Sequence, residues 1–457
     1  MAGKALSLGR FDAGRDLMRE QMTRGRVLAV LAGAVAVWSA VALAAAGAAN
    51  AGTVRAARAV PAAGSWGKAI EVPGLGALNK GGTAVVVSVS CGSAGSCAAG
   101  GFYLDRHRHR QGFVAVERNG RWGRAIEVPG LGTLNTGGDA VVVSVSCASA
   151  GSCAAGGDYT RRHGGLQGFV AVERNGRWDR AFEVRGLAAL NTGGHAEVNS
   201  VSCGSAGSCA AGGDYRDRHS RLRGFVADER NGRWSTAIEV PGLAALTTGG
   251  PAGVNSVSCA SVGSCAAGGF YLDRHGHRQG FVADERNGRW GTAIEVPGLG
   301  ALNTGGPAGV NSVSCASPGS CAAGGDYADG DGNAQGFVAD EDNGVWGTAI
   351  EVPGLAALNT GGFVQVLSVS CGSAGNCAAG GDYTRPHGSL QGFVAVERYG
   401  RWGEAIEVPG LAALNKGDGA VVVSVSCGSA GSCAAGGEYA DRPDRGQGFV
   451  AVERNGR

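Results

Sequence analysis

"SVSCGSAGSCAAGGFY", residues 88–103, places two cysteines six positions apart among very small side chains. The stretch recurs at a constant step of 56 residues, and a tryptophan repeats with the same step from Trp66 to Trp402. Seven units of this length fill residues 66–457 with nothing left over. A fixed period indicates a repeat architecture, so we interpret these residues as one array of seven equivalent units rather than as separate domains.

One unit contains four short runs with strand-like composition, separated by turn signals. In the second unit they cover residues 141–147, 152–159, 168–173 and 178–184. The pair Asn175-Gly176 joins the third run to the fourth and is a strong hairpin signal. A long exit loop, residues 185–196, leads to the next unit. Four antiparallel strands with one long exit loop are typical of a propeller blade, so we predict an all-β, seven-bladed β-propeller.

Side-chain size supports this order of strands. If the first run lies innermost, the side chains grow outward from Val and Ser, through Ala and Gly, to Trp, as a wedge-shaped blade requires. Proline lacks a backbone N–H and is tolerated at a sheet edge, and it follows the outer run in six copies: Pro73, Pro129, Pro241, Pro297, Pro353 and Pro409. The array starts with an outer run, residues 66–72, and stops after a third run. We therefore predict that the N-terminal outer strand completes the seventh blade and closes the ring.

The segment before the array has the features of an export signal. A basic lead is followed by residues 27–48, which carry no charge, and by Ala49-Asn50-Ala51, which has the small-x-small form of a signal-peptidase site. Translation from Met22 would shorten the lead to a normal length. We interpret residues 1–51 as a signal peptide or an uncleaved membrane anchor and residues 52–65 as a linker. Both alternatives predict a secreted or cell-surface, extracellular array.

The cysteines lie at the mouth of the hairpin between the first and second strands, where facing Cβ atoms approach disulfide distance. An even number at fixed spacing in an exported chain predicts a disulfide framework, each bridge contributing roughly 2 kcal/mol in the loop-entropy model. Zinc is the weaker alternative, because no second pair of ligands lies nearby in sequence. The seven predicted bridges are Cys91–Cys97, Cys147–Cys153, Cys203–Cys209, Cys259–Cys265, Cys315–Cys321, Cys371–Cys377 and Cys427–Cys433.

Three features of the unit resemble the kelch repeat of β-propellers: the doublet Gly100-Gly101, Phe113 in the third strand and Trp122 at the start of the fourth. The cysteine pair together with "GFVAVERNG" is similar to repeats in exported actinobacterial proteins whose role is mostly undescribed. The resemblance covers residues 66–457. It implies a propeller fold and specifies no activity.

Catalysis requires a constellation that occurs once, whereas nearly every polar residue here occurs seven times. Glu71, Glu117 and their equivalents are therefore interpreted as structural. The sequence contains no sialidase-type S-x-D-x-G-x-T-W box, P-loop, G-x-S-x-G or H-E-x-x-H. Without residues 1–51 the charge is about −1, which does not favour nucleic acid. We expect a non-enzymatic, monomeric protein without cofactor or metal that binds a glycan, cell-wall or protein ligand. The alternatives are a scaffold without a small ligand and a glycoside hydrolase-like propeller.

Differences among the copies gather on the face that carries the exit loop and the loop between the second and third strands. Seven histidines lie there, and solvated loop tips explain them better than a metal or anion site. Asp329, Asp331 and Asn333 resemble part of a calcium loop, but further ligands are missing. At the mouth of the central channel, departures from the repeat predict a ligand site, with drift between copies as the alternative. These residues are Asp139, His195, Glu197, Asn199, Asn255, Asn311, Phe363 and Gln365.

Overall fold

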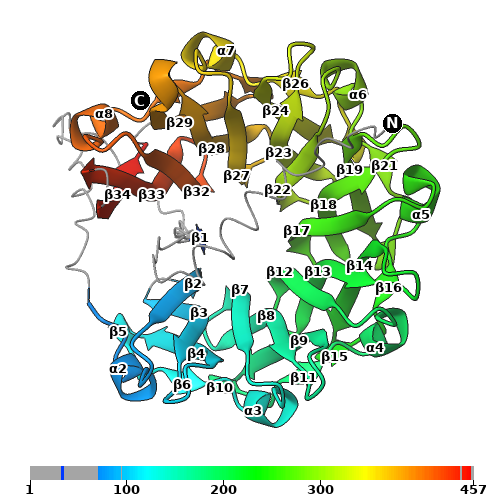
Figure 1. Ribbon diagram of the computed structural model, residues 1–457, viewed down its shortest axis with the longest axis vertical. Coiled ribbons are helices and arrows are strands. Elements are labelled where there is room, and N and C mark those ends of the chain that lie inside the picture. The colour runs from blue at the N-terminus through cyan, green and yellow to red at the C-terminus, as the bar shows by residue number, and fades with distance from the viewer. Residues whose placement is uncertain (1–31, 35–69, 94, 443–444, 454–457) are drawn as a thin grey trace, which may run out of the picture.

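The computed structural model describes residues 32–34, 70–93, 95–442 and 445–453. Seven antiparallel sheets are arranged around a central axis in the order of the chain (Figure 1). The predicted seven-bladed β-propeller is confirmed. Blades 1 to 6 each contain the inner, second, third and outer strands, and three strands of blade 7 are described. The predicted closing strand falls mainly on residues 66–69, outside the described residues, and the described residues 70–72 form no strand.

Each blade is built from three long strands. The inner strands are β2 (Ala84–Ser93), β7 (Ala140–Ser149), β12 (Ala196–Ser205), β17 (Ala252–Ser261), β22 (Gly309–Ser317), β27 (Val364–Ser373) and β32 (Ala420–Ser429). The second strands are β3 (Ser96–Leu104), β8 (Ser152–Thr160), β13 (Ser208–Arg216), β18 (Ser264–Leu272), β23 (Ser320–Ala328), β28 (Asn376–Thr384) and β33 (Ser432–Arg442). The third strands are β4 (Arg110–Arg118), β9 (Leu166–Arg174), β14 (Leu222–Arg230), β19 (Arg278–Arg286), β24 (Ala334–Asp342), β29 (Leu390–Arg398) and β34 (Arg445–Val452).

The outer strand is interrupted in each of the six blades where it is described. Its two short pieces both pair with the third strand. They are β5 (Arg121–Trp122) with β6 (Ile126–Glu127), β10 (Arg177–Trp178) with β11 (Phe182–Glu183), β15 (Arg233–Trp234) with β16 (Ile238–Glu239), β20 (Arg289–Trp290) with β21 (Ile294–Glu295), β25 (Val345–Trp346) with β26 (Ile350–Glu351), and β30 (Arg401–Trp402) with β31 (Ile406–Glu407).

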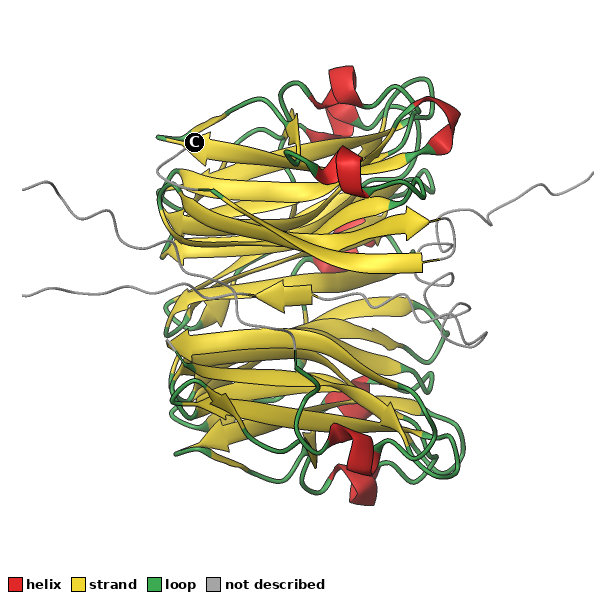
Figure 2. Cartoon of the chain, turned by 90° about the vertical axis from the view of Figure 1, so that its left-hand side faces the viewer, coloured by secondary structure: helices red, strands yellow, loops and turns green. Residues whose placement is uncertain are grey.

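Each exit loop contains one helical turn that the sequence reading treated as loop. The turns are α2 (Leu75–Leu78), α3 (Leu131–Leu134), α4 (Leu187–Leu190), α5 (Leu243–Thr247), α6 (Leu299–Leu302), α7 (Leu355–Leu358) and α8 (Leu411–Leu414), with η1 (Pro386–Gly388) in another loop. A glycine in the left-handed region precedes each α turn, and the first leucine is buried in the core. Figure 2 shows these helices on one side of the disc, which we call the exit-loop face.

The small residues of the inner and second strands allow neighbouring blades to approach closely. A Cβ placed on Gly212 would lie 2.6 Å from Val257 Cγ1 of the next blade. The serines of the inner strands bridge the same interface, because Ser200 Oγ accepts the backbone N–H of Val257 at 3.1 Å. Equivalent bonds recur from blade 1 to blade 7. Close packing between neighbouring blades therefore depends on the glycines of the second strands, which leave room for the valines of the next inner strand.

All seven predicted disulfides are present, and the described residues contain no free cysteine. Each joins directly opposed residues of the inner and second strands, as Cys203 and Cys209 illustrate. Disulfides persist in oxidising environments, so this framework indicates an oxidising compartment outside the reducing cytosol.

The proposed signal peptide or anchor and the linker fall almost entirely outside the described residues. The exception is β1 (Ala32–Ala34), which pairs in parallel with inner strand β2. Among the helices of the described residues, none has the length and apolar character needed to span a membrane.

Candidate functional site

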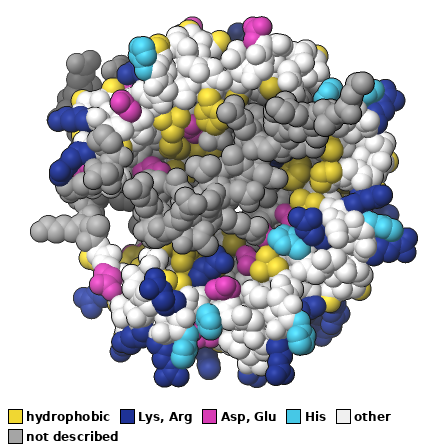
Figure 3. All heavy atoms as spheres, viewed as in Figure 1, with side chains coloured by type: hydrophobic (Ala, Val, Ile, Leu, Met, Phe, Trp, Pro, Cys, Tyr) yellow, Lys and Arg dark blue, Asp and Glu magenta, His cyan; other side chains and the backbone are white. Residues whose placement is uncertain are grey.

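The two faces of the ring carry the loops expected of them. On the exit-loop face, the N–H of Gly81 in an exit loop bonds Leu104 O at the end of a second strand. On the opposite face, the N–H of Gly120 in the Asn-Gly turn bonds Gly95 O in the disulfide hairpin. We call this second side the disulfide face. Figure 3 shows the exit-loop face, where basic, acidic and histidine side chains are distributed around the ring.

The three predicted asparagines lie at a β-bulge in the inner strand. The ladder between the inner and second strands shifts register between Val198 and Ser200, so Asn199 has no partner residue in this ladder. Its Nδ2 donates to Val254 O of the next blade at 2.9 Å. Asn255 and Asn311 reach the corresponding carbonyl oxygens of Val310 and Val366, at 2.8 and 3.0 Å. These amides therefore connect blades 3 to 6.

The sequence reading missed a set of acidic side chains in the second strands, and the structure places some of them beside the predicted asparagines. They follow the glycine doublet of the second strand, in a run otherwise made of Ala, Gly and Tyr. An acidic residue within a strand of otherwise small, apolar residues is the feature of the sequence that could have identified them. The position reads Phe102, Asp158, Asp214, Phe270, Asp326, Asp382 and Glu438 around the ring.

In blade 3, this position forms a cluster with three of the predicted residues. Asp214 accepts a hydrogen bond from Asn199 Nδ2 at 2.9 Å. His195 Nε2 lies 3.2 Å from Glu197 Oε1 and 3.8 Å from Asp214 Oδ1. The four side chains therefore lie close together on a single sheet.

A second group spans blades 4 to 6, and we call Arg278, Asn311, Asp326, Gln365 and Asp382 the mouth cluster. Asn311 Nδ2 donates to Asp326 Oδ1 at 2.8 Å, and Gln365 Nε2 donates to Asp382 Oδ1 at 3.0 Å. Asp382 is fully buried, and its Oδ2 has no hydrogen-bond partner among the described residues. Asp326 keeps some exposed surface.

Arg278 reaches this group from β19 because the adjacent inner strand has a glycine. Its guanidinium carbon lies 4.2 Å from the centre of the Phe270 ring. A Cβ on Gly309 would lie 3.3 Å from Arg278 Nη2, so a larger residue there would crowd the guanidinium. The arrangement places one cation where its charge acts on Asp326.

The two carboxyl groups have different environments. Burial, and then the negative charge of Asp326, raises the pKa of Asp382 to about 7. Burial also raises the pKa of Asp326, and the charge of Arg278 opposes that rise. Because like charges resist joint ionisation, the negative charge of Asp326 favours the protonated form of Asp382.

This shift predicts a pH-dependent stability. The pKa of Asp382 in the folded chain exceeds its ordinary value of 3.8, so the unfolded chain loses the proton first as pH rises. The free energy of unfolding should fall between about pH 4 and pH 7, by up to about 1.4 kcal/mol per pH unit from this group. Urea unfolding should show a smaller fall in Asp382→Asn, whereas the exposed-loop control Asp331→Asn should follow the wild type. Equal slopes in all three proteins would contradict the assignment.

The remaining predicted residues lie apart from the mouth cluster or at its edge. Asp139 accepts the backbone N–H of Arg110 at 2.9 Å and belongs to the blade 1 to blade 2 contact. Phe363 is 37% exposed and directly precedes β27, which carries Gln365. The structure thus joins Asn311 and Gln365 to the acid pair by hydrogen bonds, places Phe363 at the start of the strand that carries Gln365, and leaves Asp139 elsewhere on the ring.

The possible calcium loop is held by its own hydrogen bonds. Asp329 Oδ1 accepts the backbone N–H groups of Asp331 and Asn333, at 3.0 and 2.8 Å. Asp329 Oδ2 accepts Gln335 Nε2 at 3.0 Å. Within the described ranges, no three His, Cys, Asp or Glu side chains are grouped as a metal site would require.

The fold defines the class of the protein as a seven-bladed β-propeller. No protein-family model and no curated protein matches the chain. The kelch and actinobacterial resemblances therefore stay predictions.

Solved structures with a similar fold are found among glycan-related proteins. The Hadza microbial sialidase Hz136 is 10% identical with a TM-score of 0.37, and the match covers 76% of this chain and 73% of that one. A polysaccharide lyase of family PL25, an ulvan lyase, is 10% identical with a TM-score of 0.43, covering 79% and 91%. The subtype N11 neuraminidase-like protein of A/flat-faced bat/Peru/033/2010 is 12% identical with a TM-score of 0.36, covering 69% and 88%.

The expectation of a non-enzymatic binding protein is not retained: two of the similar structures carry the names of enzymes, a sialidase and a polysaccharide lyase. At this identity the likeness concerns the fold. The sequence reading did not find the mouth cluster. Its acid pair comes from two blades, and residues separated by one repeat are brought together only when the ring forms.

Proposed function

We propose that the chain is an exported, glycan-acting propeller enzyme that hydrolyses glycosidic bonds at the mouth cluster. The observation that carries the proposal is the placement of two carboxyl groups on neighbouring blades, Asp326 bonded to Asn311 and Asp382 bonded to Gln365, with the charge of Arg278 acting on Asp326. Glycoside hydrolysis uses two carboxyl groups, of which one donates a proton to the leaving oxygen and the other is ionised. Carboxyls whose pKa values are pushed apart by their environments suit these two roles.

The roles within the pair follow from exposure and charge. Asp326 is partly exposed and is the carboxyl that a sugar can contact. Asp382 is fully buried, so we assign it to positioning: it holds the proton of the pair, because burial and the charge of Asp326 raise its pKa. Arg278 stabilises negative charge on Asp326. Phe363 offers an exposed aromatic face beside the cluster, against which a sugar ring can pack.

Atoms balance in the proposed reaction without a cofactor. The glycosidic C–O bond breaks as the leaving oxygen takes a proton from the acid pair. Water supplies the hydroxyl to the anomeric carbon and returns a proton to the pair.

A screen with fluorogenic glycosides tests the proposal on the purified, disulfide-intact protein. We expect release of the fluorophore from at least one glycoside, with a rate that falls above about pH 7 as the pair loses its last proton. Hydrolysis of none of a panel of neutral, uronic and sialic acid glycosides would reject the assignment.

A further inference from the structure

On the disulfide face, an arginine at the end of the third strand of a blade forms hydrogen bonds with the next blade. Arg174 Nη2 donates to Glu229 Oε1 at 2.6 Å and to Gly232 O at 2.7 Å. We call this arrangement the arginine clamp. It is also formed by Arg118 with Glu173 and Gly176, by Arg230 with Glu285 and Gly288, and by Arg286 with Glu341 and Gly344, and Arg398 pairs with Glu453.

The clamp is missing between blades 5 and 6, because Asp342 takes the place of the arginine. The glutamate that the arginine would meet, Glu397, is only 3% exposed. It accepts a backbone hydrogen bond from Cys377 and, within the described residues, pairs with no cationic side chain. A Cβ on Gly400 would meet no atom within 4 Å, whereas one on Gly288 would lie 2.5 Å from Arg230 Nη1. The space of a guanidinium is therefore open at this junction.

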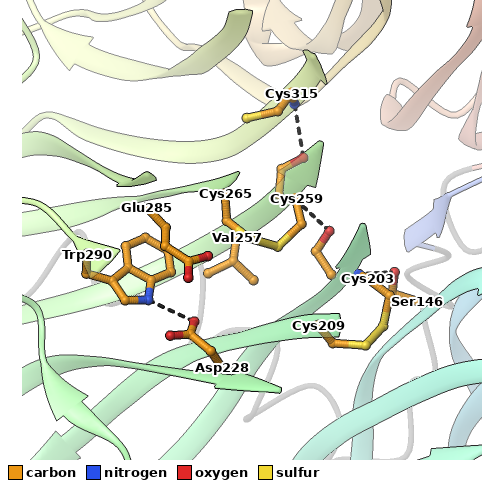
Figure 4. Close-up of a disulfide and its surroundings, with 12 residues drawn as sticks. Ser146, Cys203, Cys209, Asp228, Val257, Cys259, Cys265, Glu285, Trp290 and Cys315 are labelled. Carbon is orange, nitrogen blue, oxygen red and sulfur yellow. Dashed lines mark hydrogen bonds between the residues drawn. A yellow bond between two sulfur atoms is a disulfide. The ribbon is translucent and has the colours of Figure 1, made fainter. Parts of the chain in front are cut away.

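A further carboxylate borders that space. Figure 4 shows the corresponding place between blades 3 and 4, where Trp290 Nε1 donates to Asp228 beside Glu285. Between blades 5 and 6, Trp402 Nε1 donates to Asp340 Oδ2 at 2.8 Å, and Asp340 Oδ1 has no hydrogen-bond partner among the described residues.

We call Asp340, Asp342 and Glu397 the acidic junction. Burial raises the pKa of Asp340 to about 6, and burial with the charge of Asp340 raises that of Glu397 to about 7. Each buried carboxyl is held partly protonated because no cation balances its charge.

Two further departures from the repeat lie at the same junction. The turn position that is Asn in blades 1 to 5 is Tyr399, which has a φ of 53° and a side chain that is 93% exposed. A bulky residue in the left-handed region is strained, and such strain often accompanies a function. Val345, 70% exposed, replaces the arginine that starts the outer strand in the other described blades. At this junction blade 5 therefore has Asp342 and Val345 where other blades have arginine, and blade 6 has the exposed Tyr399 where blades 1 to 5 have asparagine.

We propose that the acidic junction is a socket for an arginine side chain of a protein partner. The guanidinium would take the place of the missing clamp arginine, pairing with Glu397 and with the carbonyl oxygen of Gly400. Its planar fork matches a carboxylate better than an ammonium does, and its face can stack on Tyr399. Val345 adds an apolar contact at the rim.

The shape of the equivalent junction supports a socket of this size. Between blades 4 and 5 a cavity of about 360 Å³ is lined by Asp284, Arg286, Gly344 and Trp346. The corresponding residues between blades 5 and 6 are Asp340, Asp342, Gly400 and Trp402. Two more lining residues, Arg289 and Val345, correspond to Val345 and Arg401, so the junction between blades 5 and 6 loses two arginines and gains one. The net loss of positive charge, with Asp342 in place of Arg286, favours a cationic occupant from outside the chain.

Calorimetric titration with the peptide acetyl-Gly-Arg-Gly-amide tests the proposal on the whole, oxidised protein. We expect binding that releases protons near pH 6.5, because the guanidinium favours ionised Asp340 and Glu397. Released protons appear as a dependence of the measured heat on the ionisation enthalpy of the buffer. The citrulline peptide, which has the same shape without the charge, should bind at least ten times more weakly.

Two variants separate the socket from general electrostatic attraction. Asp342→Arg should restore the clamp, raise the melting temperature and weaken binding of the arginine peptide at least tenfold. Asp331→Arg makes the same charge change on the exit-loop face and should bind the peptide like the wild type. Equal binding by wild type and Asp342→Arg, equal binding of the citrulline peptide, or no binding to the wild type would each overturn the proposal. A raised melting temperature in Asp342→Arg shows that this variant is folded.

Discussion

Replacing Asp326 by asparagine is expected to lower kcat/KM about 100-fold or more on any glycoside that the protein hydrolyses, since acid–base groups contribute factors of this order. Asparagine preserves the shape of the side chain but neither donates an acidic proton nor carries a charge. The Asn311 amide that now donates to Asp326 Oδ1 keeps an acceptor, so the melting temperature should change little. The measurements are initial rates across pH 4 to 9 and a thermal melt of each protein.

The second member of the pair should affect the pH profile more than the rate maximum. Asp382→Asn removes the carboxyl whose pKa is raised to about 7, so the alkaline fall in rate should leave this range and move to lower pH. Asp158→Asn, at the same register position in blade 2, is the matched control and should keep the wild-type rate. Full activity in Asp326→Asn would show that another group performs the proton transfer, even if the protein is a hydrolase.

The other large effect concerns the inner part of a blade. Gly213→Ala is expected to cost about 3 kcal/mol or more, because a Cβ on Gly213 would lie 1.9 Å from Glu197 O of the paired inner strand. Backbone atoms of the bulged strand would have to move. The Phe225 ring, which lies 3.1 Å from the same Cβ, would have to repack as well. Chemical unfolding with intact disulfides measures the loss.

Gly165→Ala provides the matched control in the adjacent blade. The nearest atom to its Cβ, Gly194 O, lies 3.5 Å away, which is an ordinary contact. This variant should unfold within about 0.5 kcal/mol of the wild type, as is usual for surface changes. Similar losses in both variants would mean that the second glycine of the doublet is not required by the bulge.

The local parts of the fold were predictable because each unit carries its own signals seven times. Hairpin signals, small inner residues and paired cysteines act over a few positions, and they indicated the strands, the disulfides and the two faces. The interrupted outer strand and the helical turns were missed. Their causes are contacts with the next blade, such as the N–H of Ala181 bonding Pro129 O, which no single unit reveals.

The candidate sites were less predictable for the same reason. Asn311 and Gln365 were predicted from their departure from the repeat, but their partners Asp326 and Asp382 share a position with other acids and attracted no notice. What distinguishes Asp326 is a neighbour on another blade: Arg278 begins β19, and Gly309 leaves room for it. A comparison of the copies in sequence does not show which side chains of different blades come into contact.

The sequence by itself determined a ring of seven similar blades, because period, strand pattern and cysteine spacing are encoded within 56 residues. Only the tertiary structure decided which unlike copies become neighbours. It set Asp326 near Asp382 toward the exit-loop face and left Glu397 near Asp340 toward the disulfide face. Charge interactions and packing across an interface depend on distance in space. In this chain they join residues that lie about one repeat apart in the sequence.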